Sequence, residues 1–183
     1  TVFLDEIGDM GPSLQAKILR FLEEKAFKRV GGTRDIRVDV RVIAATNKNL
    51  SEAVRERQFG EDLYYRVNVI PIHIPPLRDR VEDIPLLAAH FVQHFDREFK
   101  KNVQGFTRNA LRALSSYHWP GNVRELRNVV ERVMILESRE WLHLEDLPPE
   151  IRTYGGGPKH GEDAEVFELP ARGVVLEEVE ESL

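Results

Sequence analysis

Two short apolar runs along the chain each pass into polar residues, and a helical pattern separates them. The first run, Val2-Phe3-Leu4, passes directly into Asp5 and Glu6, and Gly8 follows shortly after. Such a run is typical of a strand buried on both faces, as in a parallel sheet. Open α/β sheets bind ligands outside the carboxyl ends of their strands, where two acids can hold hydrated magnesium. On this stretch alone, a strand that ends in a solvated acidic turn is slightly favoured.

The second run is predicted to end in small polar side chains. Arg37 to Val42 alternates strictly between polar and apolar residues, as a strand with one buried face does. It continues into Ile43-Ala44-Ala45 and ends at Thr46 and Asn47. If the two strands are parallel, these polar residues share one rim with the acid pair. Thr and Asn at a strand end fit a simple turn, and beside two acids they also suit a phosphate or a water.

The segment between these runs predicts a helix and a glycine-containing turn. Gly11-Pro12-Ser13 precedes the helical pattern, with Pro12 suited to the first turn. The expected apolar face consists of Leu14, Ile18, Phe21 and Leu22. Phe27 to Arg34 is basic and contains the pair Gly31-Gly32, which signals a tight or mobile turn. A solvated hairpin loop and a loop that moves against a partner fit this segment equally.

The pattern changes character near Pro75-Pro76. Before it, Leu50 to Phe59 predicts a short helix with Ser51 as cap, and Val67 to Ile74 predicts an edge or irregular strand because it contains Pro71. After it, the pattern is helical only, so we place a subdomain boundary at this proline pair.

Three helices are predicted beyond this boundary. Asp83, Thr107 and Asn122 are the expected caps. The expected inward positions are Leu87, Ala88, Phe91 and Phe95, then Ala110, Leu111 and Leu114, then Val123, Leu126, Val130 and Val133.

Arg124 lies in the first turn of the third helix, where a positive charge opposes the helix dipole. A local rule broken without visible compensation often marks a functional site. A surface arginine paired with Glu125 accounts for it equally well. His90 and His94 lie four positions apart, but no Glu follows His90 to complete a metalloprotease pattern, so a solvated helix face is favoured.

Composition narrows the class of protein. The 183 residues carry a formal net charge of −5, with 42% hydrophobic and 31% charged residues, which suits a soluble globular protein without a basic field for nucleic acid. The chain contains no cysteine, which excludes disulfides and thiolate chemistry and fits a cytoplasmic location. No apolar run approaches membrane-spanning length, so no membrane contact is expected.

The two ends indicate a piece of a longer protein. The chain opens inside a predicted strand without an initiator methionine, and it closes at Glu181-Ser182-Leu183, inside the predicted first turns of an amphipathic helix. Residues 155–163 have the composition of a flexible polar linker.

An ordered set of motifs resembles one family. Val2 to Met10 resembles the Walker B region of bacterial enhancer-binding proteins, the AAA+ activators of sigma-54 RNA polymerase. Each motif is moderately specific, whereas the ordered set, which runs from Thr1 to about Arg152, is very specific. The further motifs, in the family's order, are Phe27–Gly32, Ala44–Asn47, Asp62–Arg66, Pro75–Arg80 and Trp119–Leu126.

The resemblance implies an α/β fold in which a partial AAA+ parallel-sheet subdomain is followed by an all-α lid subdomain. Residues 1–76 would be the C-terminal part of the α/β subdomain and residues 77–152 the lid. Residues 153–165 would be a flexible linker, and residues 166–183 the start of a C-terminal, DNA-binding region.

The same resemblance implies ATP hydrolysis with Mg²⁺. Asp5 would hold Mg²⁺ through water, Glu6 would polarise the attacking water, and Arg66 would act across a subunit boundary as an arginine finger. Thr46 and Asn47 would form the first sensor of the γ-phosphate.

Arg124 would be the second sensor, which would explain a cation at that helix terminus. The parent protein would form a hexameric homo-oligomeric ring, within a two-component system, that activates sigma-54 RNA polymerase. Its DNA contacts would lie beyond the chain.

Two departures from the family's pattern matter. The family usually has another arginine six positions before Arg66, where this chain has Gly60. Arg55 and Arg57, a few residues upstream, are the candidates to take its place. The phosphate-cradling loop and the sigma-contacting loop do not occur in residues 1–183, so we expect the isolated chain to be inactive. A non-catalytic AAA+ regulator that assembles or senses ligand is the alternative, and another AAA+ machine is disfavoured by the motif order.

Overall fold

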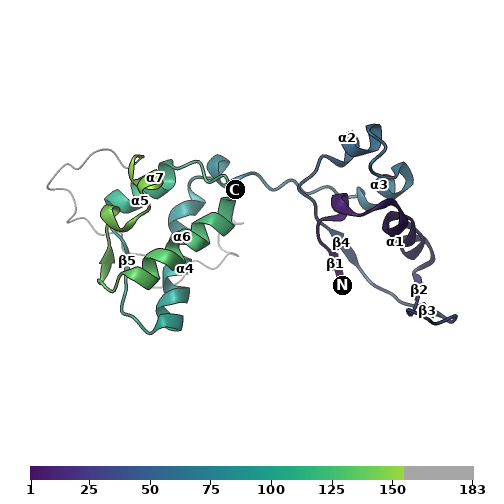
Figure 1. Cartoon of the computed structure of the whole chain (residues 1–183), viewed down its shortest axis with the longest axis horizontal. Helices are drawn as coiled ribbons and strands as arrows, with labels where there is room; N and C mark the ends of the chain where they lie inside the picture. The colour runs from purple at the N-terminus through teal and green to yellow at the C-terminus, as the bar shows by residue number, and fades with distance from the viewer. Residues whose placement is uncertain (155–183) are drawn as a thin grey trace, which may run out of the picture. The chain divides into compact units, whose positions relative to one another are not determined.

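The computed structural model describes residues 1–154, which fall into two compact units, one of Thr1–His73 and one that starts at Ile74 (Figure 1). The first unit combines strands and helices, and the second is almost entirely helical. The predicted mixed α/β class is therefore confirmed. The predicted linker and the last predicted helix lie outside the described residues.

A pair of parallel strands organises the first unit. Strand β1 (Val2–Leu4) pairs with β4 (Val42–Ala44), so that Val2 lies opposite Val42 and Leu4 opposite Ala44. The antiparallel hairpin of β2 (Ala26–Lys28) and β3 (Asp35–Arg37) forms a separate sheet. The remaining elements are the 3₁₀ turn η1 (Ile7–Asp9) and the helices α1 (Pro12–Glu24), α2 (Leu50–Arg55) and α3 (Glu61–Val67).

The core of the first unit is small and lies between its helices and η1. Helix α1 begins with Pro12 at its first position, as predicted, and it packs against α3. Gln15, rather than the expected Leu14, faces this core, because its amide bonds to the loop before α3. The buried apolar residues are Ile7, Ala53, Phe59 and Leu63.

The single strand expected from Arg37 to Ala45 is divided. Its first part belongs to β3 and its last part to β4, and these strands pair with different neighbours. The predicted alternation of half-buried and exposed side chains still holds from Ile36 to Val42. β1 is not buried on both faces, because Phe3 remains 60% exposed.

Two other expectations for this unit are wrong. Helix α2 ends at Arg55, and its cap is Asn49, whose Oδ1 accepts hydrogen bonds from the Glu52 N–H and the Ser51 hydroxyl. Residues 67–74 do not form a strand, because Val67 completes α3 and the following residues find no strand partner within residues 1–154.

The second unit packs three long helices around one core. Helix α4 (Asp83–Phe99) packs against α6 (Asn122–Leu136) and α5 (Arg108–Ser116). The buried Trp119 is among its largest side chains, and its indole N–H donates to the Leu114 carbonyl at 2.8 Å. The short elements are η2 (Leu77–Asp79), the parallel pair β5 (Gly105–Phe106) and β6 (Trp141–Leu142), η3 (Leu144–Asp146) and α7 (Pro149–Arg152).

Of the three predicted caps of this unit, Thr107 is confirmed in position, and Asp83 and Asn122 are wrong by one residue. Asp83 is the first residue of α4 rather than its cap, and Thr107 stands at the cap position of α5 without a capping hydrogen bond. Asn122 is the first residue of α6, and its Oδ1 instead accepts the Leu77 N–H at 2.8 Å. The expected inward faces of α4, α5 and α6 do line the core.

Candidate functional site

The parallel pairing of β1 and β4 brings four of the predicted site residues to one rim. Asp5 and Glu6 follow β1, and Thr46 and Asn47 follow β4 at the same end of the pair. Backbone hydrogen bonds continue past the strands, because the Ala45 N–H donates to the Leu4 carbonyl and the Ile7 N–H to the Ala45 carbonyl, at 2.9 and 3.0 Å. The two loops are thus held together where the strands end.

The acid pair is exposed and its carboxylates are largely unused. The Asp5 Oδ1 atom accepts only the Glu6 N–H, at 3.0 Å, and within residues 1–154 neither acid forms an ion pair. Glu6 has a left-handed backbone with φ of 51°, a conformation that is uncommon for a residue with a Cβ. Such a rim suits a cation that keeps its own waters and adds phosphate oxygens, as Mg²⁺ does.

Among the described residues, the rim does not belong to a metal site formed by several protein ligands. Residues 1–154 contain no group of three or more His, Asp or Glu placed to hold a metal ion. His90 and His94 lie on the exposed side of α4, and His94 faces Glu98 at 3.6 Å.

The β4 side of the rim contains a residue that the sequence analysis missed. The Lys48 ammonium lies 2.5 Å from the Asp9 carboxylate, so an ion pair joins the two loops that follow β1 and β4. The Lys48 N–H also donates to the Thr46 hydroxyl oxygen at 3.1 Å. The opposite charges of the two loops were visible in the sequence, but their contact depends on the parallel register.

Arg66 lies in the last turn of α3 and is exposed. One of its terminal N–H groups donates to the Leu22 carbonyl at 3.2 Å, at the end of α1. Among residues 1–154 no acid pairs with it, so most of its donors remain available to a ligand or a neighbouring subunit.

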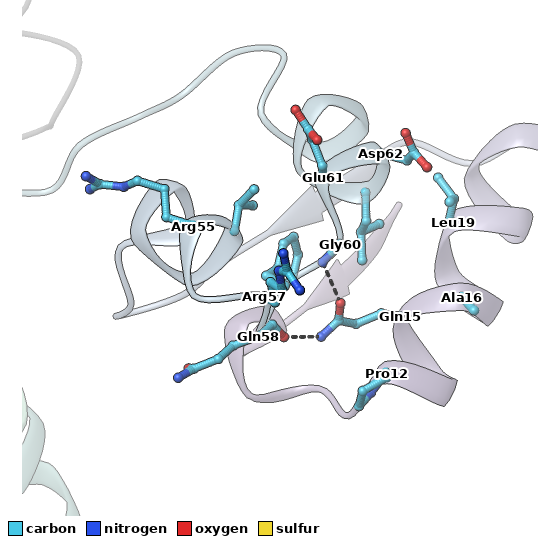
Figure 2. A pocket seen from close by; sticks show the side chains of 13 residues that line it. Pro12, Gln15, Ala16, Leu19, Arg55, Arg57, Gln58, Gly60, Glu61 and Asp62 are labelled. Carbon is cyan, nitrogen blue, oxygen red and sulfur yellow. Dashed lines mark hydrogen bonds between the residues drawn. The ribbon is translucent and has the colours of Figure 1, made fainter.

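Gly60 caps α3 beside a pocket of about 590 Å³ (Figure 2). The buried Gln15 amide holds this place, since its Oε1 accepts the Gly60 N–H at 2.9 Å and its Nε2 donates to the Gln58 carbonyl at 3.0 Å. Both Arg55 and Arg57 line the pocket, and in Figure 2 the Arg55 guanidinium points away from the other labelled side chains, whereas Arg57 is drawn near Gly60. The lining comes from the first half of α1, the end of α2, the loop between α2 and α3, and the first turn of α3.

Arg124 is exposed in the first turn of α6, on a groove of about 510 Å³ that Asn128 and Arg132 also line. The alternative in which Arg124 pairs with Glu125 is wrong, because the Glu125 carboxylate accepts the Gly121 N–H at 2.8 Å and the Tyr117 hydroxyl at 3.4 Å. Burial, and then the charge of Glu125, raise the pKa of Tyr117 and keep its proton in place for this bond. Within residues 1–154, Arg124 itself forms no ion pair.

Two family models match successive parts of the chain. The sigma-54 interaction domain matches residues 1–73, and the AAA+ ATPase lid domain matches residues 78–163. Among residues 1–154, every helix is too short or too polar to cross a membrane.

Similar proteins of known name and structure agree with these matches. The nitrogen fixation protein AnfA of Azotobacter vinelandii is 54% identical to this chain, over 84% of this chain and 29% of the length of AnfA. The transcriptional regulatory protein XylR of Pseudomonas putida is 45% identical, over 100% of this chain and 34% of the length of XylR. The crystal structure of NtrX from Brucella abortus in complex with ATP matches with a TM-score of 0.71 and 40% identity, over 81% of this chain and 36% of that one. The chain thus spans about a third of the length of these relatives.

Proposed function

Because this chain belongs to the AAA+ activators of sigma-54 RNA polymerase, the bacterial enhancer-binding proteins, we propose that it is part of an ATP-driven activator of that polymerase. The full-length protein hydrolyses ATP in a ring of six identical subunits. It works in the cytoplasm, and it contacts DNA through a region that follows the chain.

The observation that carries this proposal is the shared rim of β1 and β4. Phosphoryl transfer needs little covalent chemistry from a protein and depends on positioning and charge stabilisation. Two carboxylates after one strand suit a magnesium ion that would stabilise the phosphate charge, and a hydroxyl and an amide after the neighbouring strand suit the positioning of the phosphate.

We assign Asp5 to the water shell of the magnesium ion and Glu6 to the attacking water. Bound Mg²⁺ supplies charge neutralisation at the phosphate oxygens. The Glu6 carboxylate has no cationic partner within residues 1–154. It is therefore free to accept a hydrogen bond from the attacking water and to orient the lone pair of that water toward the phosphorus atom. Thr46 and Asn47 donate hydrogen bonds at the γ-phosphate and report its presence.

Two arginines complete the assignment from other elements. Arg66 stabilises the charge of the transition state in the neighbouring subunit, for which its largely unused guanidinium donors are suited. Arg124 reads the phosphates from the helical unit, and the ligand's negative charge compensates a cation at a helix N-terminus.

A conservative change at Glu6 tests this assignment. In the full-length protein, Glu6→Gln keeps the side-chain size but removes the base, so ATP turnover should fall by about 10²–10⁴-fold while ATP binding persists. Steady-state turnover and equilibrium ATP binding measure the two effects. Glu23→Gln on the exposed side of α1 is the matched control and should retain wild-type turnover. Wild-type turnover in Glu6→Gln would rule out the assigned role.

Gly60 supports a second candidate function, a non-catalytic regulator that keeps the fold for assembly or ligand sensing. The position before α3 carries no side chain toward the pocket, where the family's pattern has an arginine. Under this alternative the full-length wild-type protein binds ATP, forms rings and shows no turnover above that of a Glu6→Gln variant. The turnover of the wild type therefore separates the two candidates.

A further inference from the structure

The loops that follow β1 and β4 make contact beyond their backbone hydrogen bonds. After Glu6 the chain turns back, and the Asp9 N–H donates to the Glu6 carbonyl at 2.9 Å. This bond fixes the position of Asp9 relative to Glu6. Any force on the Asp9 side chain therefore acts on the turn that carries the Glu6 carboxylate.

Gly8 lets this turn approach the other loop directly. A Cβ at Gly8 would lie 2.6 Å from the Thr46 hydroxyl oxygen, closer than a Cβ atom approaches, and in tight contact with the Lys48 Cβ at 3.2 Å. The backbone of η1 thus packs against Thr46 itself. A small shift of one loop must therefore move the other.

Lys48 closes the contact from the opposite side. Its ammonium pairs with Asp9 at 2.5 Å, and its own N–H donates to the Thr46 hydroxyl oxygen at 3.1 Å. Because this bond uses the hydroxyl as an acceptor, the hydroxyl proton stays available for donation to a ligand. A continuous set of contacts, Glu6 to Asp9 to Lys48 to Thr46, joins the two sides of the rim.

We infer that the ion pair between Asp9 and Lys48 is a positioning pair, which sets Glu6 relative to Thr46 for hydrolysis; this inference rests on the proposed function. Both side chains are about half exposed, at 46% and 45%, so the pair contributes little to stability. Its effect is geometric. Displacement of a reacting group by a fraction of an ångström lowers the rate of a positioned reaction without weakening substrate binding.

Neutral variants of the full-length protein test the pair. Asp9→Asn and Lys48→Met should each lower kcat for ATP by about tenfold, with KM and equilibrium ATP affinity within about twofold of wild type. The double variant should be no slower than either single variant, because both remove the same contact. The charge-swapped variant Asp9→Lys with Lys48→Asp should recover part of the lost kcat. Thermal unfolding should stay at the wild-type midpoint in all four proteins.

A second exposed ion pair provides the matched control. Arg20 and Glu24 on α1 pair at 2.9 Å with side chains 65% and 46% exposed, away from the rim. Arg20→Met should leave kcat unchanged, which excludes a general effect of lost surface charge.

The outcomes separate this inference from the function on which it rests. A wild-type protein without ATP turnover would overturn the proposed function, and the inference with it. An active wild type with unchanged kcat in both neutral variants would overturn the inference alone. A lowered kcat that accompanies a lowered unfolding midpoint, or that the charge swap fails to recover, would also overturn it, because the pair would then act through stability or through one residue only.

Discussion

Glu6 is a residue whose backbone departs from the usual preference at the place where chemistry is proposed. Six residues other than glycine have a positive φ within residues 1–154, and Glu6 alone among them lies on the rim. A left-handed residue with a Cβ costs about 1–3 kcal/mol and persists only where its surroundings enforce it. Here the enforcing contacts are the bonds of Ile7 to Ala45 and of Asp9 to Glu6. The left-handed backbone of Glu6 therefore depends on the contact between the loops that follow β1 and β4.

Gly60→Arg is the prediction at this scale. Gly60 has a φ of −70° and ψ of 130°, and an added Cβ would lie 3.6 Å from the Gln15 Oε1, so the backbone and the pocket accept a side chain. In the full-length protein a second trans-acting cation should raise ATP turnover by about tenfold or more, with the roughly 10³–10⁵-fold effect of an arginine finger in GTPases as the upper bound.

Gly60→Gln controls for the added bulk and should leave turnover unchanged. An equal turnover in Gly60→Arg and wild type would mean that the missing arginine does not limit hydrolysis. Arg57 is then the residue to replace next, because it lines the same pocket and is drawn near Gly60 in Figure 2.

The sequence predicted where strands form more reliably than which strands pair with each other. The apolar runs at Val2–Leu4 and Val42–Ala44 became the two strands of the rim, since a short apolar run between polar residues predicts a strand from local pattern alone. The strand expected over residues 37–45 divides because β3 pairs with β2 and β4 pairs with β1. The local pattern of residues does not predict these pairing partners. Residues 67–74 fail as a strand for the same reason.

The missed polar contacts are those between residues far apart in the chain. Gln15 is buried by bonds to Gln58 and Gly60, and Asn122 leaves the expected capping role to bind the Leu77 N–H. The four rim residues were named correctly as neighbours because only a parallel register was required. The ion pair of Asp9 and Lys48 was missed because it also requires the loop conformation.

Asn122 determines how α6 begins, and its replacement is the prediction for this element. Its Oδ1 satisfies the N–H of the fully buried Leu77, and its φ of 51° suits asparagine better than alanine. Asn122→Ala should lower the free energy of unfolding of the helical unit by about 2 kcal/mol, the cost of an unsatisfied buried donor. Urea denaturation followed by circular dichroism measures this loss.

Two replacements separate the causes of that loss. Asn122→Asp keeps an oxygen acceptor and should remain near wild type, whereas Asn122→Gly accepts the positive φ but loses the bond and should fall in between. A wild-type stability in Asn122→Ala would show that water replaces the bond to Leu77.

At the scale of the whole molecule, the proposal assigns sensing and cleavage of a nucleotide to this chain, whereas residues 1–183 contain no G-x-x-x-x-G-K-[ST] loop that would cradle its phosphates. Its rim presents two unpaired carboxylates, which repel the phosphates unless a cation and further donors intervene. Arg124, the proposed second sensor, belongs to the other unit. Affinity for ATP must therefore come from elements that residues 1–183 lack.

The isolated chain should consequently fail to bind Mg-ATP with useful affinity, whereas the full-length protein should bind it. Isothermal calorimetry on both proteins, with Mg-ADP as a second ligand, measures the difference. Asp5→Asn in the full-length protein is the matched variant, because it removes a carboxylate that the proposal places in the water shell of the metal. It should weaken Mg-ATP binding while leaving binding of ATP without magnesium unchanged. Micromolar binding of Mg-ATP to residues 1–183 would show that the rim and the proposed sensors hold the triphosphate by themselves. The assignment of binding to a phosphate-cradling loop and of cleavage to the rim would then be wrong.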